Sequence, residues 1–249
     1  MTSCKPMQPF LLAAILIVGI ALPAHADNDL SYNYLELRST TRSLGTIFDF
    51  STDQLSATLD TDDETGFGIA GSVALGSNFY LTGEYLQDLD VGLTGRVSGG
   101  GESATASGTM ETRYARLALG ARIPLNDNAD LITELGAEGA AYLIPGTVSA
   151  TLPSGVTVSV SEEGVDEIDL DAKVGLRYLA AGRWELGGHL RYSQLILDEI
   201  SPNSGDIELT DGLLYGVSVM VYLGRGLGIG ATYETGDNDR LDIQLRWRF

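Results

Sequence analysis

The sequence predicts an all-β fold, a transmembrane antiparallel β-barrel of about ten strands (roughly 8–12). Three observations indicate it. Apolar and polar residues alternate over many segments of about ten residues, as in strands whose side chains point to opposite faces. Beyond residue 26, no apolar run approaches the roughly twenty residues of a spanning helix. Aromatic residues also gather at both ends of the apolar faces.

The first 26 residues are typical of a secretory signal peptide. Lys5 supplies the positive charge, residues 10–22 are uninterruptedly apolar, and Ala24-His25-Ala26 is a small-x-small cleavage site. We expect cleavage after Ala26, which leaves Asp27 as the first residue of an exported chain.

The remaining residues, 27–249, suit one large all-β barrel domain. The sequence holds 15 basic and 34 acidic residues; without Lys5 the net charge is 14 − 34 = −20. Such a charge argues against nucleic acid and against anionic lipid headgroups as direct partners. The single cysteine, Cys4, precedes the cleavage site, so the mature chain is expected to contain no disulfide. No cofactor is expected.

Ten segments alternate clearly enough to be predicted as strands. In order, they lie near residues 30–38, 67–75, 79–85, 115–123, 131–137, 170–178, 184–192, 213–223, 227–233 and 241–249. The first has the weakest pattern, because Tyr32 and Tyr34 compete with two leucines for the outer face. We place Glu36 and Arg38 inside. Twelve shorter strands remain an alternative.

The connections between these segments alternate in length. Short ones cover residues 76–78, 124–130, 179–183 and 224–226, and long ones cover 39–66, 88–111, 144–168 and 194–211. Alternation continues in residues 147–152 and 156–161, on both sides of the turn signal Pro153-Ser154-Gly155. We therefore expect some hairpins to extend beyond the membrane.

Aromatic residues on the apolar faces distinguish a membrane barrel from a soluble one. They form two groups, one towards the short turns and one towards the long loops. The members of these predicted girdles include Phe79, Tyr85, Tyr178, Trp184, Tyr192, Tyr215 and Tyr233. Rings of this kind are expected at the two membrane–water boundaries, whereas a soluble core has no reason to sort its aromatics.

The opposite faces carry charges that we expect to line the lumen. The predicted network comprises Arg116, Arg122, Glu134, Glu138, Lys173, Arg177, Glu185, His189, Arg191 and Arg246. Because unpaired buried charge is costly, we favour a salt-bridged, water-containing plug. A narrow, charge-lined pore for small ions or solutes is the alternative, and the sequence does not separate the two.

Catalytic and metal sites have little support in the sequence. His189 is the single histidine after residue 26, and its neighbours Glu185 and Arg191 favour a polar network over a general base. The acidic run at residues 60–64 offers oxygen ligands but lacks the spacing of a calcium loop. We predict no catalytic and no specific metal site, and leave open weak binding of divalent cations at the acidic loops.

The last segment has a fully apolar face that ends on an aromatic residue. This face consists of Leu241, Ile243, Leu245, Trp247 and Phe249. The segment resembles the terminal strand of bacterial outer-membrane β-barrel proteins. Together with the signal segment, the alternating strands and the rhythm of connections, it makes the chain similar to small, porin-like outer-membrane barrels of Gram-negative bacteria.

The resemblance implies a location, partners and a set of functions. The barrel would be exported and lie in the outer membrane, with short turns in the periplasm, long loops outside, and lipid and lipopolysaccharide around it. Periplasmic chaperones and the barrel-assembly machinery, which reads the terminal strand, would act during biogenesis. Since this group includes pores, adhesins, resistance factors and structural barrels, fold does not determine activity. We expect a structural or surface-interaction role first, a channel second and a hydrolase a distant third.

Overall fold

The computed structural model describes residues 30–43, 46–52, 54–144, 146–161, 165–197, 212–224, 226–236 and 239–249. The predicted signal peptide with its cleavage site, Ala24-His25-Ala26 before Asp27, lies outside the described residues, as does most of the predicted loop 194–211. No helix in the described part of the chain is long and apolar enough to cross a membrane.

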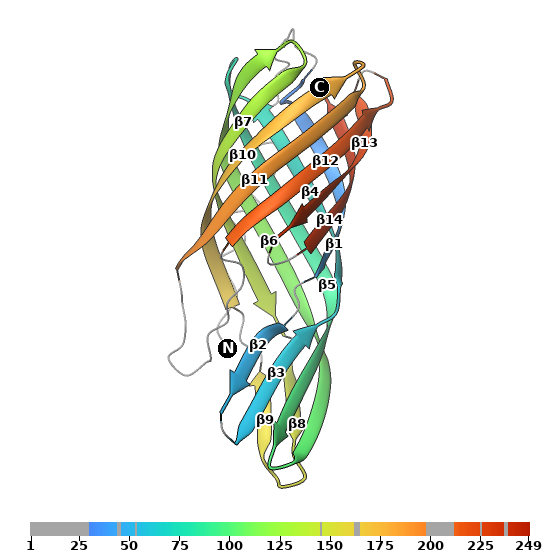
Figure 1. Ribbon diagram of the computed structural model, residues 1–249. Coiled ribbons are helices and arrows are strands. Elements are labelled where there is room, and N and C mark those ends of the chain that lie inside the picture. Colours follow the sequence, from blue (N-terminus) through green and yellow to red (C-terminus); the bar gives the residue numbers. More distant parts are fainter. Residues whose placement is uncertain are drawn as a thin grey trace.

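Ten antiparallel strands close into a barrel (Figure 1). In order around it they are β1 (Tyr34–Ser43), β4 (Glu64–Ala74), β5 (Phe79–Gly99), β6 (Glu102–Asn126), β7 (Ala129–Leu143), β10 (Val165–Ala180), β11 (Trp184–Leu197), β12 (Gly212–Tyr222), β13 (Leu227–Thr235) and β14 (Asp239–Arg248). β14 pairs with β1, with Arg248 opposite Tyr34, and this pairing completes the cylinder. The prediction of about ten strands is confirmed, and the alternative of twelve shorter barrel strands is wrong.

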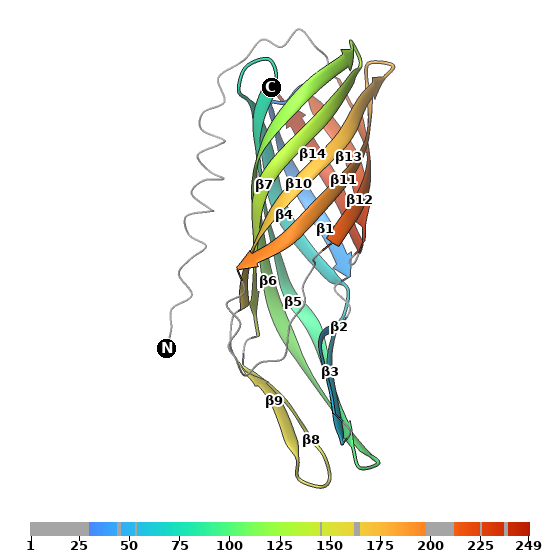
Figure 2. The same ribbon diagram turned by 60° about the vertical axis from the view of Figure 1, so that its left-hand side comes forward.

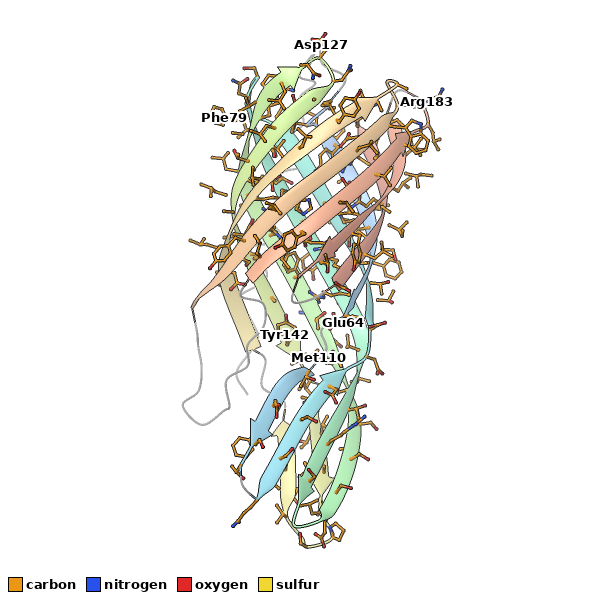
Figure 3. All side chains as sticks on the ribbon, in the orientation of Figure 1. Glu64, Phe79, Met110, Asp127, Tyr142 and Arg183 are labelled. Carbon is orange, nitrogen blue, oxygen red and sulfur yellow. The ribbon has the colours of Figure 1, made fainter. Side chains whose placement is uncertain are left out.

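Alternation along each strand separates an apolar outside from a charged inside. On the outer face, Leu135, Val217 and Trp247 are 72%, 62% and 60% exposed. On the inner face, Glu36 and Asp242 are buried. Figure 3 shows the ring of Phe79 pointing away from the barrel wall near its upper end. This distribution is the reverse of a soluble barrel, in which the apolar parity would fill the interior.

The first strand begins later than the sequence pattern predicts, at Tyr34 rather than near residue 30. Residues 30–33 instead lie at the end of the barrel, where Leu30 and Tyr32 are buried. The Asn33 side-chain oxygen accepts a hydrogen bond from the backbone N–H of Ala74 at 2.8 Å, which holds this segment against the barrel. Tyr32 shares the parity of Glu36 and Arg38, so its burial agrees with the inward placement of these two residues.

Short turns join the strands at the end of the barrel where β14 finishes. Gly76, Gly182 and Gly224 have φ values of 97°, 67° and 99° in three of these turns, a backbone region that glycine adopts without strain. Asp127 and Arg183 mark this end in Figure 3. The predicted short turns at this end are confirmed. The prediction of a long loop at residues 88–111 is wrong, because β5 and β6 continue through it to a turn at Gly100 and Gly101, and residues 198–211 lie outside the described part of the chain.

At the opposite end, strands continue far beyond the cylinder (Figures 1 and 2). β5 and β6 stay paired as far as Gly99 opposite Glu102. β3 (Leu55–Thr61) pairs with this part of β5, and β2 (Thr46–Ser51) pairs with β3, so the sheet here runs β2-β3-β5-β6. β8 (Thr147–Thr151) and β9 (Thr157–Ser161) form a separate hairpin on both sides of the predicted turn.

Apolar residues hold the β8–β9 hairpin against the four-stranded sheet. One cluster joins Leu59, Val91, Leu93, Met110, Tyr142, Ile144 and Val148, and a second joins Ala57, Val97, Ala150 and Leu152. Met110 and Tyr142 lie where the barrel meets this extension (Figure 3). Burying a leucine or valine side chain contributes about 1.5–3 kcal/mol, so the extension has a core of its own. We call it the outer sandwich: β2, β3, β8, β9, residues 91–99 of β5 and residues 102–110 of β6.

Candidate functional site: an ion-paired lumen

Charged side chains from most strands of the barrel converge in its interior because they share the inward parity of their strands. Arg38 of β1 forms ion pairs with Glu36, with Glu84 of β5 and with Asp242 of β14, the last at 3.6 Å. Arg240 contacts Glu84 at 2.8 Å and Asp242 at 2.9 Å. β14 and β5 are separated by β1 and β4 around the wall. The contact between Arg240 and Glu84 therefore spans the lumen as a chord.

A second set of contacts continues this network towards the short turns. Arg246 of β14 contacts Glu36 at 2.7 Å and Glu185 of β11 at 3.2 Å. Arg177 contacts Glu185 at 2.9 Å, and the Tyr222 hydroxyl donates to the same carboxylate at 2.8 Å. Because β12 and β13 lie between β11 and β14, the contact of Arg246 with Glu185 also crosses the interior.

A separate cluster lies against β6, β7 and β10. Arg116 contacts Asp171 at 2.5 Å and Glu134 at 3.0 Å, and Lys173 contacts Glu134 at 2.8 Å. The Tyr80 hydroxyl donates to Glu134 at 2.9 Å. Two cations and one hydroxyl thus surround a carboxylate that is only 5% exposed, and their charges offset the cost of its burial.

Gly120 on β6 leaves the space that the Tyr80 ring occupies, because it has no side chain. A Cβ atom at Gly120 would lie 2.2 Å from the ring. We expect Gly120→Ala to displace Tyr80, to remove its hydrogen bond to Glu134 and to lower the free energy of unfolding by about 1–3 kcal/mol. Urea titration in detergent micelles measures this change. Gly188→Ala, whose Cβ would meet no atom closer than 3.9 Å, is the matched control and should not destabilise the barrel; equal losses would contradict the packing argument.

His189 belongs to a third cluster, towards the long hairpins. Its Nε2 atom lies 2.8 Å from Glu234, which also accepts from Arg191 at 2.8 Å. Arg191 contacts Glu138 at 2.5 Å, and the Ser193 hydroxyl donates to Glu138 at 2.6 Å. Histidine and serine are therefore engaged with different carboxylates, an arrangement that favours a structural network over a nucleophile and its base.

The end of the lumen near the short turns is filled by Tyr32. Its ring lies 4.6 Å from the Tyr80 ring and faces the guanidinium groups of Arg177 and Arg122 at 4.4 and 5.2 Å. Its hydroxyl donates to Asp130 at 2.9 Å. Burial raises the pKa of Tyr32, so the hydroxyl keeps its proton and its hydrogen bond at any physiological pH.

The structure distributes the ten predicted lumen residues over these groups. It brings together Arg116, Glu134 and Lys173; Arg177, Glu185 and Arg246; and Glu138, His189 and Arg191. Arg122 lies apart from them at the mouth, 3.7 Å from Asp130, and its Nε donates to the Ser77 carbonyl at 2.6 Å.

Sequence reasoning missed the tyrosines that donate to buried carboxylates. They are Tyr32, Tyr80, Tyr114 and Tyr222. It also passed over Arg240, a central member of the network. A signal was present: Tyr80 shares the parity of Glu84, and Tyr114 shares that of Arg116, so each occupies a polar face. Parity therefore identifies them better than residue type does.

A cavity of about 160 Å³ lies in the lumen. Arg38, Glu84, Lys173, Arg191 and Gln244 are among the residues that line it. A polar space of this size can hold ordered water molecules among the paired side chains.

The outward-facing residues singled out in the sequence all belong to the barrel wall. Leu241, Ile243, Leu245, Trp247 and Phe249 are 41–60% exposed on the outer face. Phe79, Tyr178 and Trp184 lie beside the short turns, and Tyr192, Tyr215 and Tyr233 lie further towards the long hairpins, each more than 40% exposed. Tyr85 is half-buried and donates weakly to Gln87 at 3.4 Å.

The acidic run at residues 60–64 does not converge on one point. Asp60 accepts a hydrogen bond from Thr46 at 2.7 Å, whereas Glu64 turns inward to Arg42 at 2.7 Å. Asp62 and Asp63 remain exposed. Among the residues that the structure describes, no group of three histidine, cysteine, aspartate or glutamate side chains is arranged to hold a metal ion.

A closed antiparallel barrel with an apolar outer face and an ion-paired interior defines a membrane-spanning β-barrel protein. Residues 11–220 match a family model described as outer membrane protein beta-barrel domain. The chain belongs to this family. No curated protein matches its sequence.

Solved structures resemble the chain at low sequence identity. OprG from Pseudomonas aeruginosa is 12% identical over 90% of this chain and 99% of its own, with a TM-score of 0.46. The translocator domain of the autotransporter NalP from Neisseria meningitidis is 16% identical over 98% and 95%, with a TM-score of 0.49. The outer membrane protease OmpT from Escherichia coli is 10% identical over 92% and 99%, also with a TM-score of 0.49. These likenesses concern architecture and assign no role.

Proposed function

We propose that this protein is a closed outer-membrane barrel that holds the outer sandwich at the cell surface for interaction, and that it is neither a channel nor an enzyme. The observation that carries the proposal is the set of ion pairs across the lumen, above all Arg240 with Glu84 and Arg246 with Glu185. Each pair ties together strands that are not neighbours, so it stabilises the cylinder and obstructs passage at once.

The outer sandwich supports the second half of the proposal. Its two layers enclose their own apolar clusters, and a purely structural barrel has no need of such a body beyond the membrane. Its outer faces carry serine and threonine, among them Thr105, Ser107, Ser149 and Thr157, which suits a soluble, exposed surface.

The proposed setting follows from the outer face of the barrel. The signal peptide would direct export, the aromatic girdles would lie at the two membrane–water boundaries, and lipid and lipopolysaccharide would surround the wall. The terminal strand would be read by the barrel-assembly machinery after delivery by periplasmic chaperones. In this orientation the short turns lie in the periplasm and the outer sandwich outside the cell, where its exposed acids would interact weakly with divalent cations.

A narrow channel is the second candidate, favoured by the cavity of about 160 Å³ among charged side chains. Planar bilayer recordings of the purified protein separate the two. We expect little or no conductance, because paired side chains fill the cross-section. Large, stable and reproducible current steps would overturn the closed-barrel proposal and establish the channel.

A further inference from the structure

The four-stranded sheet of the outer sandwich has two edges that differ in character. One edge is β2, which has six residues, a register shift between Thr46 and Phe48, and an exposed Asp49. The other is formed by residues 102–110 of β6, which we call the open edge. These residues pair with β5 on one side, and β6 pairs with β7 only from Glu111 onwards.

Proteins usually guard sheet edges against unwanted pairing with short strands, bulges, charges or proline. β2 has three of these guards. The open edge has nine residues in unbroken register with β5, from Glu102 opposite Gly99 to Met110 opposite Val91. Residues 103–110 contain no proline and no charged side chain. In Figure 1 this strand borders the sheet on the side away from β2.

We propose that the open edge pairs with the open edge of a second copy of this protein in a facing membrane, so that the outer sandwich mediates contact between cells that carry it. This inference rests on the proposed function, because it names the partner of the outer sandwich.

Strand direction selects a facing membrane over the same membrane. In the proposed orientation, β6 runs from the outer tip at Glu102 down to its own membrane. Two copies in one membrane would have parallel β6 strands, whereas copies in opposed membranes have antiparallel ones. Antiparallel pairing continues the pattern of the sheet, in which the described strand pairs are all antiparallel, and adds a strand through main-chain hydrogen bonds.

The sequence of the open edge is suited to pairing with itself. If Ala106 faces Ala106 of the second copy, Thr105 faces Ser107 and Ser103 faces Thr109. Cross-strand pairs of hydroxyl residues are favourable, and Ala104 then faces Gly108 on the other side of the sheet. Glu102 faces Met110, so this register opposes no like charges.

Within the described part of the chain, no strand pairs with the free side of the open edge. Ser103, Thr105, Ser107 and Thr109 are exposed on the outer face of the sheet. The opposite, apolar face is covered by the β8–β9 hairpin, whose Val148 packs over Gly108. In the described part of the chain, the unpaired backbone of the edge is therefore the feature left for a second copy.

Cysteine variants test both the partner and the register. The single native cysteine, Cys4, precedes the predicted cleavage site. Two vesicle populations would carry Thr105→Cys and Ser107→Cys protein with different dyes. Opposed residues in an antiparallel pair have Cα atoms ~4.5–5.5 Å apart, within the range of a disulfide. We expect the mixture to aggregate and, under mild oxidation, to form several-fold more disulfide-linked dimer than either population alone. Equal linkage in the separate populations, or no aggregation, would overturn the proposal.

Charged substitutions supply the matched control. Thr105→Lys with Ser107→Lys guards the open edge, whereas Thr58→Lys with Thr94→Lys places the same charge on the same face of β3 and β5. We expect vesicle association to fall to the level of empty vesicles for the edge variant and to persist for the interior variant. Similar association in both would refute edge pairing. Current recordings remain a separate readout, so a closed barrel that does not associate refutes only this inference.

Discussion

Replacing Glu36 by glutamine is expected to lower the free energy of unfolding by about 3–5 kcal/mol, the usual cost of removing one partner of a buried ion pair. Glu36 is fully buried at 0% exposure and lies between Arg38 and Arg246, the latter at 2.7 Å. A neutral amide would leave two guanidinium groups short of a counter-charge. The midpoint of heat- or urea-induced unfolding in detergent micelles, followed by gel mobility, measures the loss.

The exposed pair of Glu111 with Arg113 provides the control for this prediction. Their side chains are 33% and 42% exposed at a separation of 3.6 Å, so Glu111→Gln should change stability by no more than about 1 kcal/mol. Adding Arg246→Met to Glu36→Gln should recover part of the loss, because one uncompensated charge is removed with it. If Glu36→Gln were as mild as Glu111→Gln, the ion pairs would contribute little to holding the strands together.

Removing one charge pair that spans the lumen should convert the closed barrel into a conducting one. The double variant Glu84→Ala with Arg240→Ala deletes one negative and one positive side chain, so net charge is unchanged while the cross-section widens. We expect stable current steps several-fold larger than any seen with the unaltered protein, since the cavity of about 160 Å³ would gain the volume of both side chains. Single-channel recording in planar bilayers measures the effect.

The exchange variant Glu84→Arg with Arg240→Glu is the matched control, because it restores a pair across the same chord with reversed polarity. It should stay closed. Conductance in the exchange variant equal to that of the double alanine variant would show that loss of the native fold, rather than removal of bulk, opened the barrel. If neither variant conducted, other ion pairs, such as Arg246 with Glu185, would suffice to block the lumen.

These predictions treat lumen and outer sandwich as separate in function. The lumen contacts act within the wall, tying β14 to β5 and to β11, and their loss is read out as stability and current. The outer sandwich has its own clusters around Leu93 and Val97, so edge variants should alter association while leaving the barrel folded. Because stability and current report on the lumen while vesicle association reports on the outer sandwich, each proposal can be refuted independently of the other.

Residue alternation was enough to predict the barrel and the parity of its charges. Leu245 and Arg246, adjacent in sequence, lie on opposite faces, because a strand alternates its side chains whatever sheet it joins. The same rule predicted that Glu36 and Arg38 face inward. It could not predict that Tyr32, which precedes the strand, is held by Asp130, a residue 98 positions away. Alternation also predicted strands that are too short, since β5 and β6 continue through the predicted loop 88–111. A register shift lies between Asp88 and Val91.

By itself, then, the sequence determined a barrel with an apolar outer face and a charged interior, since the alternation within each strand specifies both of its faces. Only the tertiary structure decided which charges meet and what lies beyond the membrane. Arg240 and Glu84 are 156 residues apart, and their contact depends on the relative register of β14, β1, β4 and β5, to which local alternation is blind. The outer sandwich arises in the same way, because β3 joins β5 and β8 covers β6 through contacts that no single segment specifies.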